Sequence, residues 1–162
     1  MSQYRVEKRR VAAELTLTDG VRRRGHIFLA SAHAAQAGPE RVADLLNAES
    51  GFFPFDTASP AAPETVLVNR AHIVHVKLVE PSNEPQLDAG YDVATVRRVE
   101  MLLSNGERLR GAVRVYCPQG RDRLSDYARS TLTFRYLETP AAIFVVNSDH
   151  VVELREEMHA AD

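Results

Sequence analysis

A β-rich segment of roughly seventy residues occurs twice in this chain, with its matching blocks in the same order. When Gly20 is placed on Gly106, ELTLTDGVRRRG aligns with EMLLSNGERLRG, 86 positions later. RVADLLN then matches RLSDYAR, and VLVNRAHIVHV matches FVVNSDHVVEL. Three matching blocks in one order favour an internal duplication over two unrelated hairpins with similar turns. We therefore expect a first module over residues 1–79, a second over 93–162, and a Pro- and Asp-rich linker over 80–92.

The first block of each module has the pattern of a β-hairpin. Apolar and polar residues alternate before and after a turn, as in strands with one face on a core and one in water. The turn is Asp-Gly in the first module and Asn-Gly in the second, so Gly20 and Gly106 occupy positions that tolerate positive φ. Gly25 and Gly111 stand inside the returning strands, where a glycine predicts a sharp bend or a bulge.

Each module continues with a helical turn and three more short strands. The helical turn carries an Arg-x-x-Asp pair, whose spacing favours a structural ion pair. A segment rich in aromatic residues predicts the third strand, and the last two strands flank an Asn-x-x-His turn. The scaffold positions that the two modules share are Gly20 and Gly106, Gly25 and Gly111, Asp44 and Asp126, Asn69 and Asn147, and His72 and His150.

This pattern resembles the Sm-like family of SH3-like barrels. The resemblance rests on five short strands, on the first hairpin with its two glycines, and on the terminal Val-Asn-x-x-His pair of strands. It implies an all-β fold of two tandem five-stranded barrels, each with a short helical turn, and RNA contacts in the last loops. Asp149 lies in one of those loops and would repel phosphate. The chain is also similar to small bacterial proteins with the same elements, which implies no activity.

A second resemblance concerns the N-terminal segment EKRR, from Glu7 to Arg10, ahead of a β-barrel. It is similar to PilZ domains, which bind cyclic di-GMP through an arginine pair and a downstream Asp/Asn-x-Ser-x-x-Gly. The segment NAESG, from Asn47 to Gly51, does not have that spacing. We therefore expect no nucleotide cofactor.

Basic residues in the first module are the candidate site for an anion or a nucleic acid. They are Arg9, Arg10, Arg22, Arg23 and Arg24. Clustered arginines favour phosphate contacts. The alternative is a solvated strand face neutralised by neighbouring carboxylates, and the scarcity of aromatic residues nearby favours it.

No group of residues in the sequence has the pattern of a catalytic or metal site. His72 and His75 are three apart, so on a strand they would point to opposite faces and make poor co-ligands. Cys117 is the only cysteine, which excludes an internal disulfide, and we expect a half-buried, inert thiol. An enzyme would need Cys117 and His150 to meet in space. We expect neither enzymatic activity nor a metal or other cofactor.

Charge and hydropathy favour a cytoplasmic protein without a membrane segment. No run of eighteen apolar residues is present, and no apolar stretch follows the basic N-terminus. Residues 1–79 hold ten Lys/Arg and eight Asp/Glu, a charge of +2, whereas residues 80–162 hold ten and fourteen, a charge of −4. Small sheets leave open edges, so we expect a non-enzymatic module that binds a protein partner or itself, with its own modules sharing an interface. The alternative is an Sm-type RNA- or nucleotide-binding protein.

Overall fold

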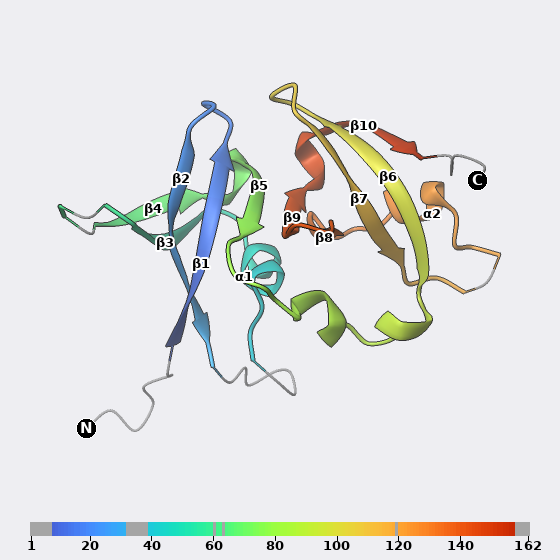
Figure 1. Cartoon of the computed structure of the whole chain (residues 1–162), viewed down its shortest axis with the longest axis horizontal. Coiled ribbons are helices and arrows are strands. Elements are labelled where there is room, and N and C mark those ends of the chain that lie inside the picture. Colours follow the sequence, from blue (N-terminus) through green and yellow to red (C-terminus); the bar gives the residue numbers. More distant parts are fainter. Residues whose placement is uncertain (1–7, 32–38, 60, 63, 119, 158–162) are drawn as a thin grey trace.

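The computed structural model describes residues 8–31, 39–59, 61–62, 64–118 and 120–157. The first copy contains β1 (Lys8–Leu17), β2 (Arg22–Ala30), α1 (Val42–Ala48), β3 (Phe52–Thr57), β4 (Thr65–Asn69) and β5 (Ile73–Leu78). The second contains β6 (Thr95–Leu103), β7 (Arg108–Val115), α2 (Leu124–Ala128), β8 (Phe134–Glu138), β9 (Ile143–Asn147) and β10 (Val151–Glu156). Within these ranges both copies thus have five strands and one short α-helix in the same order (Figure 1). None of the helices in these ranges is long and apolar enough to span a membrane.

The ten described strands form one antiparallel sheet in the order β10-β6-β7-β8-β9-β5-β1-β2-β3-β4. In Figure 1 the strands of the first copy lie on the left and those of the second on the right, with β5 and β9 between them. The expectation of two five-stranded barrels is wrong, because these strands form a single open sheet. β5 pairs with β1 on one side and with β9 on the other, so neither of its edges is left to close a barrel in its own copy.

The pairing of β5 with β9 connects the two copies, and we call it the joint. Two apolar cores lie on either side of the joint, and each takes side chains from both copies. The first core gathers residues of β1, β2, α1 and β3 and includes Phe134 and Val145 from the second copy. The second core gathers residues of β6, β7 and β8 and includes Val74 from the first copy. Because each small core is completed by the other copy, the two modules share an interface, as their size predicts.

The turn glycines have the backbone conformation that the sequence predicts. Gly20 has φ of +84° and Gly106 has φ of +87°, and each donates its N–H to the carbonyl of the last residue of the preceding strand, Leu17 or Leu103. The hairpins β1–β2 and β6–β7 are therefore closed by equivalent tight turns.

The strand glycines serve close approach rather than a bulge. Gly25 and Gly111 pair in unbroken register within their hairpins. A Cβ added at Gly25 would lie 1.8 Å from the carbonyl oxygen of Asp56, and one added at Gly111 would lie 2.6 Å from that of Glu138. Only glycine lets β3 and β8 come this near.

The linker is an ordered part of the structure. It forms 3-10 turns at Glu84–Leu87 and Tyr91–Val93. The buried carboxylate of Glu84 accepts hydrogen bonds from the backbone N–H of Val42 and from the hydroxyl of Tyr136. Burial raises the pKa of Glu84 above its ordinary value. The linker therefore ties the first residue of α1 to a strand of the other copy.

Candidate functional site

The joint between β5 and β9 combines a strand ladder with inserted side chains. Val76 pairs with Val145 across it. Phe134, at the start of β8, is 3% exposed and Val145 is 0% exposed, because both enter the first core. Val74 of β5 is 0% exposed and enters the second core. The joint is thus sealed by apolar side chains from both directions.

The Asn-x-x-His turn of the second copy adds polar contacts across the joint. The side-chain amide of Asn147 donates to the carbonyl of Ile73 at 3.0 Å, while its oxygen accepts from the N–H of Asp149. His150 Nε2 lies 2.9 Å from the carbonyl oxygen of Ala71, and its Nδ1 lies 2.9 Å from the hydroxyl of Ser104. A proton on Nε2 satisfies both contacts, since Nδ1 then accepts from the hydroxyl.

The same turn in the first copy keeps the local contacts without the cross-joint ones. Asn69 accepts from the N–H of Ala71 at 3.0 Å, and His72 Nδ1 lies 2.9 Å from the hydroxyl of Thr18. Within the described residues, the amide nitrogen of Asn69 and Nε2 of His72 have no hydrogen-bond partner. These two groups are the equivalents of those that cross the joint in the second copy.

The two ends of the sheet expose the counterparts of the joint residues. Phe52 and Leu67, which match Phe134 and Val145, are 60% and 68% exposed. Val152 of β10, which matches Val74, is 62% exposed. Beside β10 lies a cavity of about 220 Å³ lined by Met101, Val146, Val151 and Leu154 among other apolar residues, and by Arg135 and Ser148. One end of the sheet therefore projects apolar side chains and the other presents a largely apolar hollow.

An ionic contact also crosses the joint. The buried His75 of β5 contacts the carboxylate of Glu107, which follows the β6–β7 turn. The other oxygen of Glu107 lies 2.9 Å from the guanidinium of Arg22. Burial lowers the pKa of His75, although Glu107 opposes this shift. A neutral ring with its proton on Nε2 donates to Glu107, and its Nδ1 is buried without a partner in the described structure.

The arginines predicted as an anion-binding cluster are separated and mostly paired. Because Lys8 pairs with Ala30 and Thr16 with Arg22, Arg9 and Arg10 lie at the opposite end of the β1–β2 hairpin from the other three. Their partners are the Glu40 carbonyl for Arg9, Asp56 for Arg10, Glu14 and Glu107 for Arg22, and Glu14 for Arg24. Arg23 has no ion pair within the described ranges. Glu7 of the EKRR segment lies outside the described residues.

Both Arg-x-x-Asp pairs cap their helices, but the pair in the first copy makes more ionic contacts than the pair in the second. Asp44 and Asp126 each accept the backbone N–H of the arginine three residues earlier, at 2.9 and 3.0 Å. The guanidinium of Arg41 also binds Asp44 and reaches Asp88 of the linker. Asp126 instead has Arg129 at 3.8 Å. The first pair therefore fixes the linker as well as the helix.

In each copy an arginine binds a carbonyl near the helix C-terminus, Arg70 from the 3-10 turn after β4 and Arg135 from β8. Arg70, which is buried, donates to the carbonyl of Leu45 and lies over the ring of Phe53, 5.4 Å from its centroid. In the second copy Arg135 occupies the place of Phe53 and donates to the carbonyl of Tyr127, the equivalent of Leu45. Its guanidinium lies 3.7 Å from the centroid of the Tyr127 ring. An arginine thus binds the equivalent helix carbonyl in both copies, although the two arginines occupy different positions in the repeat.

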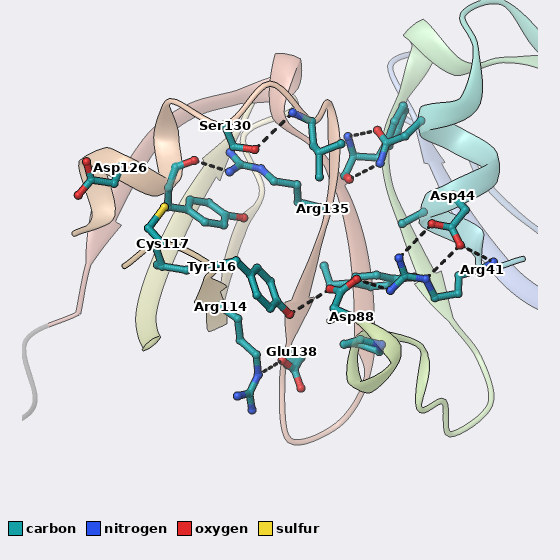
Figure 2. A pocket seen from close by; sticks show the side chains of 18 of the residues that line it. Arg41, Asp44, Asp88, Arg114, Tyr116, Cys117, Asp126, Ser130, Arg135 and Glu138 are labelled. Atoms are coloured by element: carbon teal, nitrogen blue, oxygen red, sulfur yellow. Dashed lines mark hydrogen bonds and ion pairs between the residues drawn. The ribbon is translucent and has the colours of Figure 1, made fainter. Parts of the chain in front are cut away.

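A larger cavity, of about 600 Å³, lies between the copies (Figure 2). Its walls are α1, the linker, the end of β7, α2 and β8. Tyr116 and Asp88 meet across it through a 3.0 Å hydrogen bond, and Arg135 lies on the other side of it from Arg41. The cavity is built from both modules and the linker.

Cys117 is exposed, so the expectation of a half-buried thiol is wrong. It borders the larger cavity, where no histidine is among the lining residues. His150 is engaged at the joint instead. The structure does not bring Cys117 and His150 together in one site, and no group of three metal-ligating side chains occurs among the residues that it describes.

Sequence reasoning missed the joint residues Phe134, Val145 and Val74 and the cavity residue Arg135. A signal for the joint is the segment IVHV of β5, which is apolar on both faces, as in a strand with neighbours on both sides. A signal for the cavity is the charged residue Arg135, because the equivalent residue in the first copy is the apolar Phe53. Comparisons of the chain with protein-family models, with curated proteins and with solved structures found no match.

Proposed function

We propose that this chain is a non-enzymatic interaction module that associates with further copies of itself, head to tail, through β4 and β10. The observation that carries the proposal is the mismatch between duplicated residues. Phe134 and Val145 are 3% and 0% exposed, whereas their counterparts Phe52 and Leu67 are 60% and 68% exposed. Exposed apolar residues that repeat the core of an existing interface favour a second interface of the same kind.

The hollow beside β10 matches the surface that the first copy offers to Phe134 and Val145. In the first copy the side chains of Phe134 and Val145 from the second copy cover that surface. In the second copy its counterpart is the cavity of about 220 Å³ next to β10. Repetition of the internal joint would place Phe52 and Leu67 of one molecule in the hollow of the next, with Leu67 opposite Leu154.

Polar groups support the same arrangement. The free amide nitrogen of Asn69 and Nε2 of His72 would bond the carbonyls of Val151 and Asp149 of a second copy, as Asn147 and His150 bond Ile73 and Ala71 within the chain. The first module has a charge of +2 and the second −4, so a head-to-tail contact brings opposite net charges together.

The backbone of β4 is arranged for another strand. Pro54 of β3 is paired with Leu67 and has no N–H, so these two residues cannot exchange two hydrogen bonds. Because the ladder alternates, the N–H and the carbonyl of Leu67 face the open side of the sheet. An unpaired edge of this kind accepts a further strand. A contact between different edges generates a ring or an open array.

The test compares two substitutions at position 67 by sedimentation velocity over a wide range of protein concentration. Leu67→Pro removes an N–H that the monomer does not use, so it should fold and remain monomeric. Leu67→Thr keeps the N–H but loses apolar surface, so it should associate more weakly than the wild type and more strongly than Leu67→Pro. A wild-type protein that stays monomeric up to its solubility limit, or a Leu67→Pro variant that associates as the wild type does, would refute the proposal.

A mixing experiment tests the head-to-tail direction. Val152→Asp blocks the β10 end and leaves β4 intact, while Leu67→Pro does the reverse. Each variant alone should be monomeric, and an equimolar mixture should form a heterodimer and nothing larger. Dimers of either variant alone would show that like edges pair, which would overturn the head-to-tail arrangement.

Binding of RNA is the alternative proposal, based on the strand pattern and the arginines. Three of the five arginines form ion pairs and Arg9 donates to the carbonyl of Glu40, which weakens the RNA proposal. A salt-dependent filter-binding assay with mixed RNA separates the two proposals, since phosphate contacts weaken steeply with salt. Absence of binding at low salt eliminates the RNA proposal and leaves self-association untouched.

A further inference from the structure

The larger cavity exists because the second module fills its helix region less completely than the first. In the first module Val42, Ala43 and Leu46 of α1 are buried together with Phe53. In the second module α2 is a five-residue helix with Tyr127 as its buried residue, and the slender Arg135 takes the place of the Phe53 ring. The space that results is about 600 Å³ in volume, within the size range of small-molecule sites.

Four carboxylates and three arginines line the cavity, and the carboxylates pair with arginines other than Arg135. Its carboxylates Asp44 and Asp88 bind Arg41, Glu138 binds Arg114 at 3.0 Å, and Asp126 lies 3.8 Å from Arg129. Arg135 alone among the cavity-lining arginines has no carboxylate within 4.0 Å in the described structure.

Arg135 is also incompletely hydrogen-bonded. Its Nη1 donates to the carbonyl of Tyr127, and its Nε is buried without a partner among the described residues. A partly buried guanidinium with unused donors and no counter-ion favours an anionic oxygen ligand, because such a contact satisfies charge and hydrogen bonds together.

The remainder of the wall is aromatic and aliphatic. Tyr116, Tyr127, Phe134 and Tyr136 line the cavity together with Leu132. Tyr116 is about half exposed at the mouth and is held by its hydrogen bond to Asp88 (Figure 2). Aromatic walls favour a flat ring, which stacks or meets them edge to face.

We propose that this cavity binds a small planar aromatic carboxylate, with the carboxylate on Arg135 and the ring between Tyr116 and Tyr127. The site shares Arg135 and Tyr127 with the hollow beside β10, so binding is measured at a protein concentration at which the chain is monomeric. It is formed within one chain, so binding does not require assembly.

The test uses 2-naphthoate as the probe and the neutral 2-naphthamide as its matched control, each measured by equilibrium dialysis against the full chain. The carboxylate should bind at least about tenfold more tightly than the amide, as expected for a hydrogen-bonded ion pair. Arg135→Gln should lose that preference. Arg23→Gln, which removes an exposed arginine of the first module, should bind as the wild type does.

Tyr116→Ala provides a second variant, because Arg135 also supports α2 and its replacement risks the fold. Tyr116 is near the mouth, so this variant should keep its circular dichroism spectrum and bind 2-naphthoate several-fold more weakly. The proposal is overturned by equal binding of 2-naphthoate and 2-naphthamide, by no binding of either, or by unchanged binding in a folded Arg135→Gln or Tyr116→Ala variant.

Discussion

Truncation of two equivalent phenylalanines should have very different effects on the stability of the monomer. Phe134 and Phe52 occupy the same place in the two copies, since each begins the third strand and pairs with the asparagine of the Asn-x-x-His turn. Phe134 is 3% exposed and Phe52 is 60% exposed. Phe134→Ala and Phe52→Ala therefore make the same chemical change at equivalent positions. Phe134 is covered by the other copy at the joint, whereas Phe52 lies at an uncovered end of the sheet.

The magnitudes follow from burial. Replacement of a fully buried phenylalanine by alanine costs about 3–5 kcal/mol, because the lost transfer free energy is joined by the cost of a cavity. Phe52 has roughly two-fifths of its surface covered and would leave no enclosed cavity, so only part of a transfer term of about 1.5–3 kcal/mol is lost. We expect a cost of about 1 kcal/mol for Phe52→Ala.

The assay is urea unfolding at a protein concentration low enough to keep the chain monomeric, followed by tyrosine fluorescence since the chain has no tryptophan. Equal costs for the two variants would refute the assignment of the joint. A second outcome bears on assembly: Phe52→Ala, although it should cost only about 1 kcal/mol in folding, should weaken self-association. An unchanged association constant would remove Phe52 from the proposed contact.

Three further predictions concern the backbone, a buried ring and a buried cation. Gly111→Ala should lower the free energy of unfolding by several kcal/mol, measured by urea unfolding, because its Cβ would lie 2.6 Å from the carbonyl oxygen of Glu138; a change below about 1 kcal/mol would contradict this close approach. Burial lowers the pKa of His75 in the folded state, so the unfolded chain binds the extra proton and stability should fall as pH drops below about 6.5. His75→Gln should make unfolding free energy less dependent on pH in that range, and an unchanged pH profile would count against a neutral His75. Arg70→Met should cost about 3 kcal/mol in thermal or urea unfolding, because the carbonyls of Leu45 and Phe52 lose charged hydrogen-bond donors. An effect near zero would show that water replaces the guanidinium.

Local features of the fold were predictable because their causes are local. Alternation of apolar and polar residues and the turn glycines at positions 20 and 106 determine the two first hairpins, and the structure has both. The interpretation of Gly25 was only partly right. A glycine inside a strand signals either a bulge or close backbone approach, and the choice depends on β3, which lies some thirty residues away in sequence.

The joint could not be predicted from either copy alone, because edge pairing depends on how two distant surfaces fit. β5 and β10 descend from one repeated segment, yet IVHVKL is buried on both faces whereas VVELRE carries three charges and is mostly exposed. This difference is a sequence signal that one strand is central and the other lies at an edge. Arg135 was missed for a related reason: the second copy lacks equivalents of both Phe53 and Arg70, and this shows only when the third strands of the two copies are aligned.

The two ends of the sheet are chemically different, since one projects Phe52 and Leu67 and the other is hollow. An array built on such a contact has a direction, and a molecule with one disabled end can join it at one terminus only. Leu67→Pro keeps the hollow intact and would therefore act as a chain terminator when mixed with wild-type protein. In an open array, a small fraction of this variant would set the mean length, as a chain stopper does in a step-growth polymer. A closed ring has no terminus, so preformed rings would resist the same addition.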